Sequence, residues 1–276
     1  MKKNKKTKTL VTLLLDRSGS MHSIWSDTIG AINAYMDTFR DSKSDIRFSL
    51  VLFDSYGSEM CLEKVFVAEK IKKIKSFNAG DFQPRGGTPL RDAIGTTVAA
   101  VSESLKGRDD VKVVFAIQTD GQENNSSEYS WDSVKSLISE KEKLGWEFTF
   151  MGCGINAYEQ AGRLGINQAK TVSYGKNAEQ TKAVFEASAL NTRSFAEGIS
   201  ASTVYSSEQK LRAGDEDVSV DKSADVVLNI DTSVFPSIQS SRPFASRRRG
   251  DFEGGSETVI KEKFILAYGE DDDEEK

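Results

Sequence analysis

The sequence predicts an α/β protein with a doubly wound, mostly parallel sheet between two helical layers. Short apolar segments alternate along the chain with longer segments in which apolar residues recur every three or four positions. The first pattern is typical of strands buried on both faces, and the second of helices that pack through one side. A chain of 276 residues, 38% of them hydrophobic, is long enough to bury such a core.

Each element is predicted from its local pattern. Unbroken apolar runs such as TLVTLLLD indicate strands, and the face shared by apolar residues from Trp25 to Phe39 indicates a helix. Glycines such as Gly107 and Gly145 are expected to close helices. In chain order the predicted elements are strand 9–16, helix 25–39, strand 46–54, edge strand 62–71 in a hairpin with its predecessor, helix 91–105, strand 111–120, helix 131–145, strand 146–154, helix 157–165, strand 169–174 and helix 177–198.

The chain is predicted to have one domain with an extension at each end. Residues 1–8 form a basic N-terminal arm, and residues 9–198 hold all the alternating elements. Residues 199–276 are mostly polar and are predicted to be a partly disordered C-terminal appendage that ends in an acidic tail.

The formal net charge of -5 has its origin in the tail. The stretch EDDDEEK (270–276) contains six acids and one lysine, and the remaining chain holds 36 acidic and 36 basic residues. A balanced body gives no reason to expect a nucleic-acid partner.

The N-terminus begins like an export signal, but its apolar run is short. Leu10 to Leu15 is broken by Thr12, ends at a charge and lacks a small-residue cleavage site. No other stretch approaches the roughly 20 apolar residues that span a bilayer. Cys61 and Cys153 have no paired spacing, so neither a disulfide framework nor a zinc site is expected. A cytoplasmic location without a membrane partner is predicted.

Five oxygen-bearing side chains are placed where predicted strands end or helices begin. The first three lie in DRSGSM after the first strand, the fourth in the glycine-rich loop RGGTPL, and the last in TDGQEN at the end of a central strand. Ligands of doubly wound proteins gather at such strand ends, so these residues are expected to meet. They are Asp16, Ser18, Ser20, Thr88 and Asp120.

Three hydroxyls and two carboxylates offer only hard oxygen atoms, which suits Mg²⁺, with Mn²⁺ as a substitute. Ser18, Ser20 and Thr88 are expected to bind the metal directly. Asp16 and Asp120 are expected to hold its waters through charge-assisted hydrogen bonds. A metal without direct carboxylate ligands stays electron-poor and would accept an Asp or Glu side chain of another protein.

The stretches DRSGSM, GGTPL and TDGQEN, in this order on an alternating α/β chain, resemble the metal-ion-dependent adhesion site (MIDAS) of von Willebrand factor type A (VWA) domains. The resemblance covers about residues 8–198 and includes all five ligand positions. It implies a Rossmann-like fold and a protein ligand whose acidic side chain completes the metal shell. The lysine-rich, cysteine-poor character is similar to bacterial and phage members, which implies an intracellular partner such as an ATPase or an assembly component.

Alternative interpretations use only some of these five residues. Ser18 and Ser20 could cap the following helix, since serine is a favoured N-cap. A metal-dependent hydrolase of phosphoesters or nucleotides would need a general base, and the nearby carboxylates are already assigned to the metal shell. The metal could also only stiffen loops in a structural component of a phage or large assembly. The prediction is a binding module rather than an enzyme, with His22, Arg85 and residues 121–127 on its contact surface.

Overall fold

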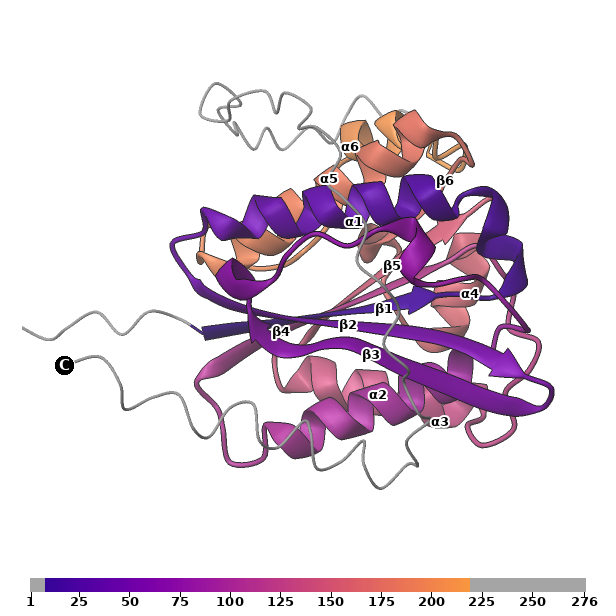
Figure 1. Cartoon of the computed structure of the whole chain (residues 1–276). Coiled ribbons are helices and arrows are strands. Elements are labelled where there is room, and N and C mark those ends of the chain that lie inside the picture. Colours follow the sequence, from indigo (N-terminus) through magenta and orange to yellow (C-terminus); the bar gives the residue numbers. More distant parts are fainter. Residues whose placement is uncertain (1–7, 219–276) are drawn as a thin grey trace, which may run out of the picture.

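The computed structural model describes residues 8–218 and confirms the predicted α/β class (Figure 1). Its sheet has six strands in the order β3-β2-β1-β4-β5-β6. The strands are β1 (Lys8–Asp16), β2 (Asp45–Tyr56), β3 (Glu59–Lys70), β4 (Val111–Thr119), β5 (Glu147–Cys153) and β6 (Thr171–Tyr174). The helices are α1 (Trp25–Arg40), α2 (Leu90–Ser104), α3 (Trp131–Lys143), α4 (Ala157–Leu164), α5 (Ala178–Ala196) and α6 (Ser207–Arg212).

All neighbouring strands are parallel except β2 and β3, which form the predicted antiparallel hairpin at one edge. The hairpin turns at Gly57, whose φ of 61° suits a residue without a side chain. Farther along β3 the register shifts near Ala68, which has a φ of 47° and donates its N–H to the Ser49 hydroxyl. The parallel strands end together on the right-hand side of Figure 1, where a site is expected.

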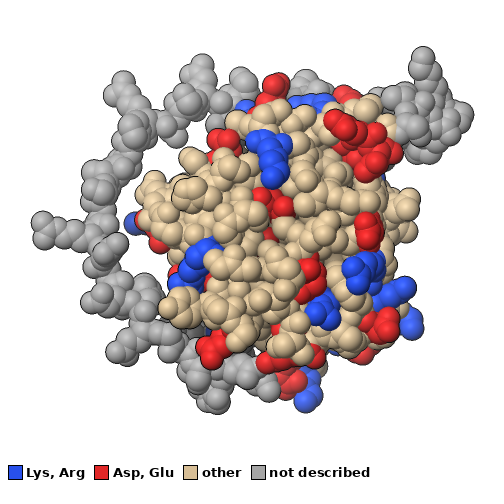
Figure 2. Space-filling view, turned by 90° about the vertical axis from the view of Figure 1, so that its right-hand side faces the viewer, with Lys and Arg blue, Asp and Glu red and all other residues tan. Residues whose placement is uncertain are grey.

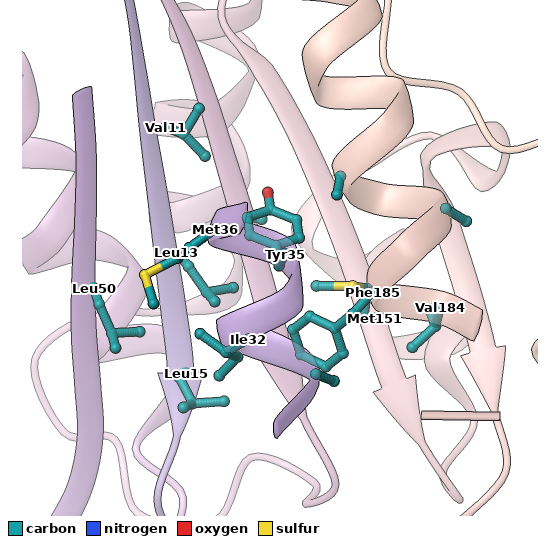
Figure 3. Close-up of a cluster of buried hydrophobic side chains, with 14 of the residues drawn as sticks. Val11, Leu13, Leu15, Ile32, Tyr35, Met36, Leu50, Met151, Val184 and Phe185 are labelled. Carbon is teal, nitrogen blue, oxygen red and sulfur yellow. The ribbon is translucent and has the colours of Figure 1, made fainter. Parts of the chain in front are cut away.

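Two apolar cores hold the helical layers on the sheet. Along β1, Leu13 and Leu15 face the core under α1 and α5, whereas Leu10 and Leu14 face the core over α2, α3 and α4. This alternation explains the unbroken apolar run, because successive side chains of a strand point to opposite faces. Figure 3 shows the first core, in which Ile32 and Met36 of α1 and Phe185 of α5 close over the sheet.

The helix boundaries follow from capping residues. The side chains of Ser130, Asn156, Asn177 and Ser206 each accept the backbone N–H three residues later, which starts α3, α4, α5 and α6. Helix α4 ends at Gly165 in the left-handed conformation, as its sequence predicts. No helix within residues 8–218 combines the length and apolar character required to cross a bilayer.

The packed body continues past residue 198, where the sequence predicts that the appendage begins. The N–H and the hydroxyl of Thr203 both donate to Glu147 at the start of β5. Asp215 is buried, and it accepts hydrogen bonds from the Tyr158 hydroxyl at 2.6 Å and the Ser173 N–H at 3.0 Å. The segment therefore covers the free edge of β6. Residues 1–7 and 219–276, with the predicted basic arm and acidic tail, lie outside the described residues.

Substitution of Asp215 by Ala is expected to lower the free energy of unfolding by about 1–3 kcal/mol, because Tyr158 and the Ser173 N–H lose a buried acceptor. Glu216→Ala removes the exposed acid that follows Asp215 and is expected to change the free energy of unfolding by less than about 0.5 kcal/mol. Urea denaturation of both variants measures the difference. Equal stabilities would mean that the hydrogen bonds of Asp215 do not contribute to the stability of the domain.

Candidate metal centre

The first predicted ligand, Asp16, ends β1 with a completely buried side chain. Its Oδ1 accepts the N–H of Ser18 at 2.7 Å, and its Oδ2 accepts the hydroxyl of Thr119 at 2.5 Å. Thr119 is the last residue of β4, which neighbours β1 in the sheet. The carboxylate is therefore held by the turn that follows it and by the adjacent strand.

The two serines face the second carboxylate. The hydroxyl oxygens of Ser18 and Ser20 lie 3.1 Å apart, and Ser20 donates to Asp120 Oδ1 at 2.6 Å. Ser18 occupies the N-cap of the short helix η1 (Gly19–Ser23), but its side chain makes no capping hydrogen bond. The capping alternative for Ser18 is therefore wrong: its hydroxyl points to the other predicted ligands.

The surroundings of Gly121 show how closely Thr88, the remaining predicted ligand, approaches Asp16 and Ser20. A Cβ atom built on Gly121 would lie 2.7 Å from Thr88 Oγ1 and 3.5 Å from both Asp16 Oδ2 and Ser20 Oγ. Three predicted ligands from two separate loops thus border the same small space beside Gly121, which lies in a third loop and has no side chain. The Thr88 loop is fixed there because Thr88 donates its N–H to Asn124 Oδ1 at 2.9 Å and Gly19 donates to the Gly86 carbonyl at 3.1 Å.

The space is bordered by two carboxylates whose burial disfavours their charged forms. Burial raises the pKa of Asp16 to about 7, although hydrogen bonds from Thr119 and Ser18 oppose the shift. Burial also raises the pKa of Asp120, against the hydrogen bond from Ser20 and the charge of Lys176. In the described chain Asp120 Oδ2 is buried without a hydrogen-bond partner. A buried carboxylate oxygen without a donor is costly unless a cation or a held water approaches it.

The donor set fits a small hard cation that keeps part of its water. The space is bordered by hydroxyls and carboxylates, which are ligands of Mg²⁺ and Mn²⁺. Residues 8–218 contain no group of three or more His, Cys, Asp or Glu side chains that could hold a metal. The structure brings all five predicted residues together, and metal binding by them stays a prediction.

The loop that follows Asp120 is held by two acidic side chains that the sequence analysis did not single out. Asp92, in the first turn of α2, accepts the N–H groups of Ser127, Glu128 and Tyr129. Glu123 accepts the N–H groups of Asn125 and Ser126. These bonds hold the predicted contact loop 121–127 in one conformation beside the site. An acid in the first turn of a helix is too common to have indicated this role.

A second network ties the other side of the site to the hairpin. Arg17, which is 4% exposed, donates from Nε to Asp54 Oδ2 at 2.6 Å and also pairs with Glu63 of β3. Arg85, next to the Thr88 loop, donates to the same Asp54 oxygen at 3.1 Å and remains half exposed. Arg85 is half exposed beside the Thr88 loop and His22 is exposed on η1, and their part in a contact surface stays a prediction.

This fold, with an oxygen-lined site at the ends of its parallel strands, defines a class of α/β binding domains. The chain belongs to the von Willebrand factor type A domain family, whose sequence model matches residues 11–210. Domains of this family typically act in protein interaction and adhesion.

Three similar proteins illustrate the relationship. The chain is 27% identical over 149 residues to the thrombospondin-related anonymous protein of Plasmodium berghei (strain Anka), which covers 52% of this chain and 24% of that protein. The pilus adhesin SpaC of Lactobacillus rhamnosus GG in its open conformation has a TM-score of 0.54 at 13% identity, over 69% of this chain and 30% of that one. Proximal thread matrix protein 1 of the mussel byssus has a TM-score of 0.50 at 14% identity, over 68% and 47%. The two solved structures share the fold, and this chain spans less than half of each relative.

Replacing Asp92 by Ala is expected to loosen the loop at residues 127–129, since three backbone N–H groups lose their acceptor. The free energy of unfolding should fall by about 1–3 kcal/mol. Faster amide hydrogen exchange at residues 127–129 is the direct measurement. Glu103→Ala, an exposed acid on the same helix, should leave exchange there unchanged. Unaltered exchange in Asp92→Ala would show that the loop is held by other contacts.

Proposed function

We propose that this chain is a metal-dependent protein-binding module of the MIDAS type, with Mg²⁺ as its ion and Mn²⁺ as a substitute. The observation that carries the proposal is the meeting of Asp16, Ser20 and Thr88 oxygens around the space beside Gly121. Thr88 and Gly121 are distant in sequence from the Asp16–Ser20 turn, and neither packing nor helix capping explains why hydroxyl and carboxylate oxygens gather there.

Each residue has a role that its present contacts support. Ser18, Ser20 and Thr88 would bind the ion through their hydroxyl oxygens. Ser20 already directs its hydrogen to Asp120 and accepts from Ser18, which leaves one lone pair for an ion. Asp16 and Asp120 would hold metal-bound water and balance the charge. The bound ion supplies an electron-poor centre that accepts a carboxylate oxygen of a protein partner.

Binding accounts for these residues better than catalysis does. Both Asp16 oxygens accept hydrogen bonds from Ser18 and Thr119, so this carboxylate is held in place rather than exposed to a substrate proton. The pilus adhesin similar in fold is a binding protein by name. We extend to this chain only the interaction role, with a partner that exposes Asp or Glu, such as an ATPase or assembly component in the cytoplasm.

Gly121→Ala is expected to weaken Mn²⁺ binding at least about tenfold, because the added methyl group would lie 2.7 Å from Thr88 Oγ1 and displace it. Isothermal titration calorimetry with Mn²⁺ and Mg²⁺ measures the affinity. Gly30→Ala is the matched control, since a Cβ atom there has nothing within 4 Å. That change, in an exposed position of α1, should leave metal affinity unchanged and slightly stabilise the helix. Wild-type affinity in Gly121→Ala would place the metal elsewhere.

Asp16→Ala and treatment with EDTA are each expected to abolish capture of the partner while leaving the fold nearly intact. Asp16→Ala removes the acceptor of Ser18 and Thr119, but it also relieves the cost of burying the carboxylate, and these opposing effects should leave the sheet folded. Proteins retained from the native host in Mg²⁺ and lost in Asp16→Ala can be identified by mass spectrometry. Recovery of the same partner with and without EDTA would contradict a metal-bridged interaction.

A further inference from the structure

Two cationic side chains flank the candidate metal centre on opposite sides along the row of strand ends. Arg85 is anchored over the end of β2, where its Nε donates to Asp54 at 3.1 Å. Lys176 follows β6, and its chain lies against Gly154 at the end of β5: a Cβ atom on Gly154 would meet Lys176 Cε at 2.5 Å. One cation therefore stands beside β2 and the other beside β5.

Both cations have charge left for a ligand. Arg85 is 51% exposed, and its ion pair with Asp54 is made through Nε, so the guanidinium group has further N–H donors for a ligand. Lys176 is exposed, and no ion pair within residues 8–218 involves it. Its side chain packs along Gly154, which follows β5, the strand next to β4. Figure 2 shows this face, with acidic atoms near its middle and basic side chains around them.

The strand order sets the spacing between these groups. The metal-centre residues Asp16 and Asp120 belong to β1 and β4, which are neighbours, and β2 and β5 lie one strand farther out on either side. Adjacent strands are about 4.8 Å apart. The centre of the β1–β4 pair therefore lies about one and a half strand spacings, or roughly 7 Å, from both β2 and β5.

Alternate residues of an extended peptide are separated by nearly the same distance of roughly 7 Å. Its residues i and i+2 point to the same side and lie about 6.6–6.8 Å apart. A segment crossing the strand ends at right angles would thus place every second side chain over one of the three positions. Carboxylates suit all three, because an electron-poor ion stands in the middle and a cation on each flank.

We propose that the site binds an extended acidic segment of a partner protein, with carboxylates at three alternate positions. The central carboxylate meets the metal, and the flanking carboxylates meet Arg85 and Lys176. This ligand class rests on the proposed metal-dependent function and adds the recognition of spacing to it. Residues between the acids point away from the domain, so their identity contributes little to affinity.

Three synthetic peptides test the spacing. Each is nine residues long and consists of serine and glycine apart from its aspartates. The first peptide carries aspartate at the third, fifth and seventh positions. The second carries the same three aspartates at adjacent positions, and the third keeps only the central one. Calorimetric titration in Mg²⁺ should rank the alternate peptide first, by about two- to fivefold for each flanking contact that the others lack.

Arg85→Met and Lys176→Met test which side chains bind the two flanking carboxylates. Each should reduce the preference for the alternate peptide by about two- to fivefold. Methionine keeps an apolar chain, which for Lys176 retains the packing on Gly154. Lys106→Met removes an exposed cation beyond the far end of α2 and should keep the wild-type preference. The Mn²⁺ affinity of each variant, measured in parallel, separates a lost flanking contact from a damaged metal centre.

The outcomes separate this inference from the proposed function. Equal affinity for the alternate and adjacent peptides, both lost in EDTA, would overturn the spacing and leave the metal-dependent module standing. Binding that persists in EDTA, or absence of binding by all three peptides in Mg²⁺, would overturn both. A preference for the alternate peptide that survives Arg85→Met and Lys176→Met would also overturn the assignment of the flanks.

Discussion

The hydrogen bond from Thr119 to Asp16 joins the two central strands at the point where both end. Asp16 and Asp120 can face the same space only because β1 and β4 are parallel neighbours in this register. Two carboxylates in that buried space oppose the stability of the fold, and the raised pKa of Asp16 shows the conflict. The burial of apolar side chains on the sheet offsets the cost of these two carboxylates. Stability therefore comes from the strands, and the proposed function from the residues at their ends.

The sequence predicts most of the fold and the five central residues because both leave local signals. Apolar periodicity marks each element, and a polar cluster after an apolar run marks the end of a strand. The parts that escaped prediction depend on hydrogen bonds between distant residues, such as Asp92 with residues 127–129 and Asp215 with Tyr158. Thr203 and Asp215 lie in a polar segment that packs on the body through side-chain hydrogen bonds. A periodic pattern of apolar residues does not reveal packing of this kind.

Membership of the VWA family explains the framework, whereas the rim belongs to this chain. Solved structures at 13% and 14% identity share the sheet and its helical layers, and so little identity leaves the loops free to differ. On the proposal made above, Arg85, Lys176 and the loop held by Asp92 and Glu123 would set the selectivity of the domain. Because the rim loop is hydrogen bonded to α2, little conformational entropy would be lost when a partner binds to it.

The two edges of the sheet have a consequence for how this molecule behaves in a crowded solution. Exposed edges invite the strands of other chains. On one side the bulge at Ala68, with its N–H turned inward to Ser49, breaks the regular edge of β3. On the other side Asp215 takes the N–H of Ser173 on β6. Both features make these margins poorer templates for pairing with the strands of other chains.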